Sequence, residues 1–506
     1  MIQCVDQARP NLAITELVPG DDTRAAGVPL SMEVAVQNFG LAPVKDVPVL
    51  ILVDGQPLPG GATIAEIPPG RVAKTRLAVQ FAKAGQHRIE ARLELDAVAA
   101  DNARYAVIDI PPAVPVLIID DDPESRGAWY LSAALAPGGP VPSGISPRIE
   151  APRYLSLNPL EGYQAVYLLN IGRLESSAID ALERYVASGH GLAVFLGDRC
   201  QPKFVNDELY RGGKGFFPVP VANQEDLPLD RLEQAPDLEV GRHPVFQVLA
   251  GSRNPFISTV NVSRYIALAK DWQKQGGPRV EVLARLRNGA PLAVERSFGE
   301  GRVVVFLSTL APVWNNWARG NPSFVVAMQR LQAYLAWRPK ADVSLRVGEP
   351  LELRLDPARY APQIRFTTPV ESKTPTPSVE ASSLSGGPLV ASLAATGNAG
   401  FYEATLHRTD GTKEVRTWAY NVEPDEGDLR MFDIPQLSSV LEGIRVEFAR
   451  AEEFSYAAEE QEPGGHLGHM LILILVFLLI AEQILAWSAS YHPAARQRTL
   501  AQGGAA

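Results

Sequence analysis

The chain has 506 residues, 46% of them hydrophobic and 21% charged, which is typical of globular proteins rather than of disordered or collagen-like chains. At roughly 150 residues per domain this length predicts about three to four domains, and 41 glycines with 42 prolines exclude a protein built mainly of long helices. A net charge of −10 argues against a nucleic-acid partner, which would require a basic face.

The N-terminal part predicts a β-sandwich. Residues 1–10 show neither a basic n-region nor an apolar h-region, so no signal peptide is visible. Either the chain is cytosolic and tail-anchored, or it is the C-terminal part of a longer protein; we favour truncation, with residues 1–10 as the remnant of a preceding domain. Residues 11–110 contain short alternating strands and an Asp54-Gly55 hairpin signal. This spacing predicts an immunoglobulin-like sandwich, suited to protein binding or to a spacer role.

Residues 113–339 change to strand–helix alternation. VPVLIID, GYQAVYLLNIG, GLAVFLGD and RVVVFLSTL contain continuous apolar strands, and SSAIDALERYVASG between the second and third is an amphipathic helix. This pattern predicts a flavodoxin-like α/β domain whose parallel sheet is covered on both faces. Ligands of such sheets bind at the carboxyl ends of the strands, which here carry Asp120–Asp122, Asn170 and Asp198.

Alternating strands return over residues 341–423 and predict a second, smaller β-sandwich, interrupted by a Pro/Ser-rich loop at 372–387. Residues 424–465 are acidic and end in Pro-Gly-Gly, so we expect a linker there.

The segment from Leu467 to Trp487 predicts one transmembrane helix. Its 21 residues would span roughly 31 Å, the thickness of a bilayer's hydrocarbon core, and Met470 to Ala481 include no polar side chain. Acidic residues precede the segment, whereas Arg496 and Arg498 follow it. The positive-inside rule therefore predicts a cytoplasmic basic tail at 488–506 and an extracytoplasmic bulk.

The acidic cluster Asp120–Asp122 has several interpretations. A phosphoacceptor receiver domain needs a carboxylate at the end of the central strand, and Asn170 is an amide that cannot accept a phosphoryl group. The cluster could hold a divalent cation, since carboxylates are good ligands of hard ions. The plainer interpretation is a solvated turn that caps the next helix.

Nucleophilic catalysis is poorly supported. Cys200 follows the GLAVFL strand. A nucleophile elbow requires small residues two positions before and after the nucleophile, but Asp198-Arg199-Cys200-Gln201-Pro202 has no glycine at either position. His243 could serve as a base, although a lone loop histidine is more often structural. Neither a CxxC pair, an HExxH motif nor a GxxxxGK[ST] loop is present, so we expect no catalytic residue, metal or cofactor.

Several segments together resemble known families. RPNLAITELVPG, VAVQNFG and AADNARYAVIDI resemble the CARDB-like (cell-adhesion-related) sandwich. VLIIDDDPES, GLAVFLGD, HPVF and FGEGRVVVFLSTLAPVWNNW resemble the class-I glutamine-amidotransferase-like domain of large bacterial membrane proteins related to the Bat (Bacteroides aerotolerance) group. GFYEATL, YNVEPDEGDL and the terminal EQILAW resemble the end of the same proteins.

The resemblance implies a protein of the bacterial inner membrane and cell envelope. Members of that group typically begin with two membrane spans and a von Willebrand factor A domain, which this chain lacks, and the wider group is associated with MoxR-type ATPases. IQCVD resembles the last strand of such a domain, in agreement with truncation.

Two hypotheses follow. The first is a non-enzymatic, membrane-anchored envelope protein that acts through protein contacts and carries a degenerate amidotransferase-like domain. The alternative is a ligand sensor or hydrolase that uses the strand-end cleft, with Asp121, Asn170, Asp198 and His243 as pocket residues. The second hypothesis requires these four side chains to converge on one concave site.

Overall fold

The structure is a computed structural model of the whole chain. It describes residues 9–20, 22–122, 124, 126–139, 142–228, 236–251, 254–274, 280–336, 344–369, 378–383, 387–429, 441, 443 and 465–489. The contacts divide the chain into two units, Arg9–Leu429 and Met1–Ala8 together with Arg430–Ala506. The expected remnant, the acidic linker, the Pro/Ser-rich loop and the basic tail lie wholly or largely outside the described residues.

The first domain is a β-sandwich, and its alternating sequence explains its two faces. Met32, Val34 and Val36 are fully buried between its sheets. Asp54 and Gly55 form the expected hairpin with φ values of 49° and 80°, which an Asp-Gly pair tolerates. One sheet has the order β1-β2-β6, the other has the order β4-β3-β7-β8, and β5 pairs with β3. The strands are β1 (Leu12–Pro19), β2 (Pro29–Asn38), β3 (Val44–Val53), β4 (Gln56–Pro57), β5 (Ala62–Ile67), β6 (Val72–Gln80), β7 (Gly85–Arg92) and β8 (Ala103–Ile110).

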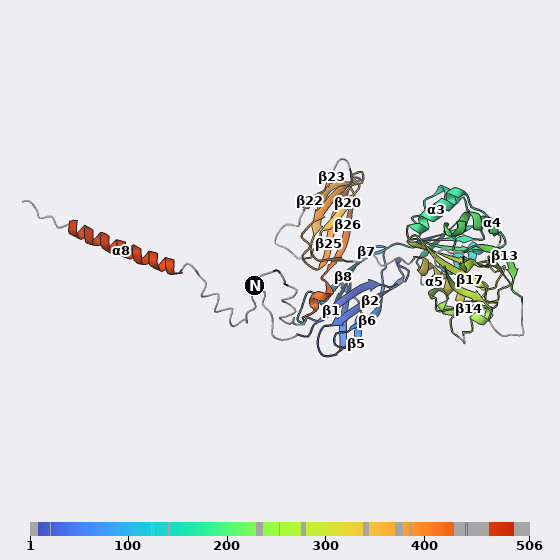
Figure 1. The fold of residues 1–506 in the computed structure, drawn as a ribbon, viewed down its shortest axis with the longest axis horizontal. Helices are drawn as coiled ribbons and strands as arrows, with labels where there is room; N and C mark the ends of the chain where they lie inside the picture. Colours follow the sequence, from blue (N-terminus) through green and yellow to red (C-terminus); the bar gives the residue numbers. More distant parts are fainter. Residues whose placement is uncertain are drawn as a thin grey trace, which may run out of the picture. The chain divides into compact units, whose positions relative to one another are not determined.

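The second domain carries the labels α3, α5 and β17 in Figure 1. It is built on an eight-stranded sheet with the order β10-β9-β11-β12-β18-β17-β16-β14. Its first five strands are parallel, as the uninterrupted apolar runs predict. The strands are β9 (Val114–Asp120), β10 (Ile145–Glu150), β11 (Ala165–Leu169), β12 (Gly191–Phe195), β14 (Leu238–Val240), β16 (Val280–Leu286), β17 (Pro291–Phe298) and β18 (Gly301–Phe306).

Beyond the five parallel strands, the sheet continues with strands of the opposite pairing. β14, β16 and β17 run antiparallel to their neighbours. Tight turns cause this arrangement: Gly289 (φ 82°) lies between β16 and β17, and Gly299 (φ 59°) lies between β17 and β18. Such short connections can join only antiparallel strands.

Helices cover both faces of this sheet, which is why neighbouring residues along a strand are all apolar. Val116 and Ile118 pack into the core that includes α1 (Gly127–Leu135) and α5 (Ser323–Ala336). Leu117 and Ile119 pack into the opposite core, beside α3 (Ser176–Ala187) and α4 (Pro202–Phe204). The rigid sheet thereby fixes the positions of the strand ends.

The third domain is a smaller β-sandwich in which the buried Leu351, Leu353 and Leu355 alternate along β20 with exposed residues. Its sheets have the orders β19-β26-β25-β21-β22 and β20-β24-β23. The strands are β19 (Leu345–Arg346), β20 (Leu351–Leu355), β21 (Tyr360–Thr367), β22 (Ser378–Glu380), β23 (Ser382–Ser383), β24 (Leu389–Leu393), β25 (Gly400–Arg408) and β26 (Lys413–Asn421).

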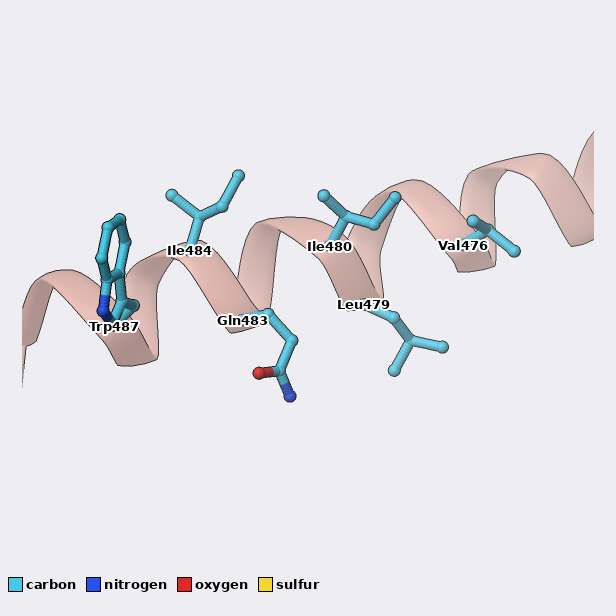
Figure 2. A pocket seen from close by; sticks show the side chains of 6 residues that line it. All are labelled: Val476, Leu479, Ile480, Gln483, Ile484 and Trp487. Atoms are coloured by element: carbon cyan, nitrogen blue, oxygen red, sulfur yellow. The ribbon is translucent and has the colours of Figure 1, made fainter.

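The C-terminal helix α8 (Gly465–Ala489) is the one helix of the described chain that is long and apolar enough to cross a membrane. The span Gly468–Ser488 has a mean hydropathy of 2.5, and none of its most apolar stretch is buried by protein. Figure 2 shows one face of this helix, where Gln483 is the only amide among apolar side chains and Trp487 lies near the end. Because all six labelled residues come from a single helix, this face is a shallow surface rather than an enclosed cavity.

Candidate functional site

The carboxyl edge of the parallel sheet collects the polar residues expected there. β11 lies between β9 and β12, and Leu169 is paired with both Asp120 and Phe195. The residue that follows β11, Asn170, therefore emerges between the segment after β9 and the segment after β12.

Asn170 is the centre of a hydrogen-bonded cluster. Its side-chain N–H groups donate to Asp198 Oδ1 at 2.8 Å and to Asp122 Oδ2 at 3.1 Å. Its side-chain oxygen accepts the backbone N–H of Arg199 at 3.1 Å. The residue is 8% exposed and has φ 48°, a left-handed conformation that asparagine tolerates better than most residues. The amide therefore uses both of its donors and an acceptor within the protein.

Asp121 joins the same edge through different partners. Its Oδ2 accepts the backbone N–H of Gly172 at 3.1 Å and lies 3.2 Å from the Arg199 guanidinium. Arg199 also donates to the backbone carbonyl of Asp121. The Arg199 side chain thus links the loop after β12 to the loop after β9.

Asp120 makes the contacts that the helix-capping interpretation of the acidic cluster predicts. Its carboxylate accepts the backbone N–H of Asp122 at 2.9 Å and that of Ala128, in the first turn of α1, at 3.1 Å. A carboxylate at a helix N-terminus stabilises the helix. Within the described residues, no group of three or more His, Cys, Asp or Glu side chains is arranged to hold a metal ion.

Gly197 explains how closely the loops approach each other. A Cβ atom on Gly197 would lie 2.4 Å from Asn170 Oδ1 and 2.9 Å from Thr309 Cγ2. Those distances are too short for any side chain, so glycine is required at this position.

His243 lies apart from the cluster. Its Nε2 is 3.7 Å from Glu295 Oε2 on β17, and its ring packs edge-to-face against Tyr334 of α5. Its Nδ1 accepts the N–H of Val245 at 3.4 Å, at the start of the helical turn Pro244–Leu249. The structure therefore brings together three of the four predicted pocket residues and gives His243 other partners. Asn170 bonds to Asp198 and to the Arg199 backbone, and the Arg199 side chain contacts Asp121.

Cys200 does not have the surroundings of a nucleophile. Burial raises the pKa of its thiol to about 12, and its side chain packs against the apolar core on the α3 face of the sheet. The thiolate is the nucleophilic form of cysteine, and the raised pKa leaves little of it at neutral pH. Nucleophile elbows also need a strained turn; among the described residues of this edge the positive φ falls on Asn170, and neither Gly197 nor Asp198 has one.

Sequence reasoning missed three residues, two at the carboxyl edge of the sheet and one beside His243. Arg199 and Gly197 flank Asp198 in the GLAVFLGDR segment, so a charged residue and a glycine beside a strand-end acid were the available signal. The third contributor is Glu295, which accepts the Tyr334 hydroxyl with both oxygens at 2.8 Å. Its buried position within the β17 strand carried no local sequence signal.

No protein-family model and no curated protein matches the sequence. Among solved structures, the chain is similar to the cytoplasmic protein STM1381 from Salmonella typhimurium LT2, with 16% identity, a TM-score of 0.32, and coverage of 44% of this chain and 99% of that one. It is also similar to a protein from Bacteroides uniformis described as ThuA-like, with 15% identity, a TM-score of 0.27, and coverage of 45% and 94%.

A further similarity is to the CARDB domain of the PF1109 protein from Pyrococcus furiosus, crystallised in complex with di-metal ions. That similarity has 17% identity, a TM-score of 0.19, and coverage of 21% of this chain and 98% of that domain. At these scores the similarities carry no argument about function. The fold of the chain rests on the strand orders and registers described above.

Proposed function

We propose that this chain is a non-enzymatic, membrane-anchored protein of the bacterial cell envelope that acts through protein contacts. The observation that carries the proposal is that polar side chains at the carboxyl edge of the α/β domain bond to one another. There Asn170 donates hydrogen bonds to both Asp122 and Asp198. At this edge an α/β enzyme would hold its substrate.

The chemistry of the nearby side chains supports the absence of catalysis. Acyl or amide transfer needs a nucleophile that ionises near neutral pH and a base within hydrogen-bond reach. Burial raises the pKa of the Cys200 thiol to about 12, and His243 contacts Glu295 and Tyr334. The α/β domain therefore serves better as a rigid module than as an amidotransferase.

The membrane part of the proposal is supported by α8, whose side chains present apolar surface without a protein cover. In water such a surface would be unfavourable by about 25 cal/mol per Å², so a lipid environment suits it. The acidic residues before the helix and Arg496 and Arg498 after it support a cytoplasmic tail. The Bat-group resemblance suggests a MoxR-type ATPase as one protein partner.

An activity assay tests the catalytic half of the proposal. The full chain is purified in detergent and incubated with L-glutamine and simple amides, and the released ammonia is measured. We expect release at the buffer rate from the wild type. Ammonia release that Cys200→Ala abolishes and Cys4→Ala retains would overturn the proposal.

Fractionation of bacterial cells tests the anchor. We expect the full chain to remain in the membrane pellet after alkaline carbonate extraction, and a chain that ends at Gly464 to be released. A full chain that carbonate extracts as readily as the shortened one would contradict membrane anchoring. A reporter fused after Ala506 then tests orientation, with a cytoplasmic signal expected.

A further inference from the structure

The first and third domains share an interface, here called the seam, formed by β8 with β26 and the segments beside them. Asn421 at the end of β26 accepts the backbone N–H of Tyr105 and donates to its backbone carbonyl, both at 2.8 Å. The Tyr105 ring packs edge-on against Phe401 at 5.1 Å. Asn421 is 3% exposed, so this reciprocal pair is shielded from water and its loss would leave buried backbone groups unpaired.

The seam continues to the helical turn Pro424–Gly427, which leads towards the membrane helix along the chain. The side-chain N–H groups of Asn11 donate to Asp101 Oδ2 at 2.8 Å and to the backbone carbonyl of Gly427 at 3.0 Å. Asn11 therefore ties the turn to the first domain.

Only glycine allows this turn to approach so closely. A Cβ atom on Gly427 would lie 2.2 Å from Asp101 Oδ2 and 3.1 Å from Phe39 Cε2. Gly427 therefore covers one oxygen of the Asp101 carboxyl group.

Asp101 is an unusual group for such a contact because it is an acid that is 2% exposed. Its Oδ1 has no hydrogen-bond partner within the part of the chain that the structure describes. Burial raises the pKa of Asp101 to about 6, the negative charge of Asp96 acts in the same direction, and the hydrogen bond from Asn11 opposes both. A buried carboxyl group with an unpaired oxygen is more stable when neutral.

We propose that the turn Pro424–Gly427 is a proton-controlled latch, which stays docked on the first domain while Asp101 is neutral and is released when Asp101 ionises. This inference goes beyond the proposed function, because it concerns the conformation of the extramembrane body and holds with or without a membrane partner.

The direction of the pH effect follows from linkage. Opening the latch exposes the carboxyl group to water, so its pKa falls from about 6 towards the ordinary 3.8. The closed form consequently binds the proton more tightly, and the closing equilibrium is strongest below pH 3.8 and weakens as the pH rises through about 6. Between pH 5 and pH 7 these values correspond to a loss of about tenfold in the closing equilibrium.

Other charged groups of the seam are accounted for. Arg104 of β8 is half-buried and interacts electrostatically with Glu423 and Glu16. Glu423 also pairs with Arg346 at 3.1 Å, and the turn itself carries Asp425 and Glu426. Because these charges also act on the seam, the test needs a variant that removes the titration of Asp101 alone.

Hydrogen exchange measured by mass spectrometry on the full chain in detergent tests the latch. After correction for intrinsic exchange rates, we expect peptides that cover β8, β26 and the turn to exchange about tenfold faster at pH 7 than at pH 5. Peptides that cover β11, in the core of the α/β domain, should change little. Seam protection that is equal at the two pH values would overturn the proposal.

Three variants test whether Asp101 and the docked turn cause the pH dependence of seam protection. Asp101→Asn keeps an oxygen that accepts from Asn11, so we expect its seam protection to be independent of pH in this range. Gly427→Ala should open the seam at both pH values, whereas Gly397→Ala, in the same domain with open space around its Cβ, should behave like the wild type. A full pH dependence in Asp101→Asn would overturn the proposal, and the wild-type profile alone decides it if that variant does not fold.

Discussion

The side-chain amide of Asn170 donates to Asp198 Oδ1 at 2.8 Å, across the loops that follow two neighbouring parallel strands. The same amide nitrogen donates to Asp122. A neutral donor between two carboxylates offsets their mutual repulsion without adding a charge, which an acid or a base at this position could not do. The edge that could have held a substrate is therefore held together by its own side chains.

Asn170→Asp tests this arrangement. The substitution removes two donors and places a third carboxylate beside Asp122 and Asp198, so we expect a loss of about 3 kcal/mol in the free energy of unfolding at pH 7. Unfolding in urea, followed by the fluorescence of the buried Trp314 and Trp317 of this domain, measures the change.

The matched control for that variant is Asp198→Asn, which keeps an oxygen that accepts from Asn170 and removes a negative charge. We expect this variant to stay within about 1 kcal/mol of the wild type. An Asn170→Asp protein as stable as the control at pH 7 would show that Asn170 does not balance the two carboxylates.

Gly197→Ala tests the packing of the same edge. The added methyl group would lie 2.4 Å from Asn170 Oδ1 and 2.9 Å from Thr309 Cγ2, and we expect it to cost about 1–3 kcal/mol in the same urea experiment. Gly162→Ala in the same domain has no atom within 4 Å of its Cβ, so it should leave stability nearly unchanged. Equal stabilities of the two variants would mean that the loops can separate at little cost.

The residues at the carboxyl edge could be predicted because buried parallel strands have a recognisable sequence pattern. Uninterrupted apolar runs identify buried strands, and the residue after each run must lie at one edge of the sheet. Asp121, Asn170 and Asp198 could therefore be grouped without a structure. His243 could not, because it lies in the long segment between β12 and β18, where the sequence pattern identified none of the three antiparallel strands.

The contacts between the first and third domains could not be predicted from the sequence. Asn11 and Gly427 are hydrogen-bonded across 416 positions, and hydrophobic periodicity says only which face of an element is buried, not which distant segment covers it. The acidic composition after residue 423 indicated a linker, whereas its first turn is docked. Glycine was the only local sign, and it is equally frequent in open turns.

The reactivity of Cys200 tests the inert-thiol argument directly. With a pKa of about 12 instead of 9.0, the fraction of thiolate at pH 8 is about a thousandfold smaller. We expect maleimide to modify Cys200 in the native chain at least a hundredfold more slowly than in urea, measured on the Cys200 peptide by mass spectrometry so that Cys4 does not interfere. Equal native and unfolded rates would reopen the possibility of a reactive cysteine.

Tyr334→Phe tests whether the buried cluster around His243 is structural. The Tyr334 hydroxyl is 2.8 Å from both oxygens of Glu295, whose side chain is 11% exposed, and the Arg302 guanidinium lies 4.3 Å from the centre of the Tyr334 ring. Removal of the hydroxyl leaves a buried carboxylate without this donor, so we expect a loss of about 2 kcal/mol in the free energy of unfolding.

The control for that loss is Tyr154→Phe, which removes a hydroxyl bonded at 2.9 Å to the neutral, half-buried Tyr163. A neutral pair contributes less than a bond to a charged group, so we expect a change of about 1 kcal/mol or less. If Tyr334→Phe lowers the free energy of unfolding no more than Tyr154→Phe does, the hydrogen bond to Glu295 contributes little to stability. That result would contradict a structural role for the cluster. A cost about twice as large as the control would instead make His243, Glu295 and Tyr334 a buried support between β17 and α5, on the sheet face opposite to α3.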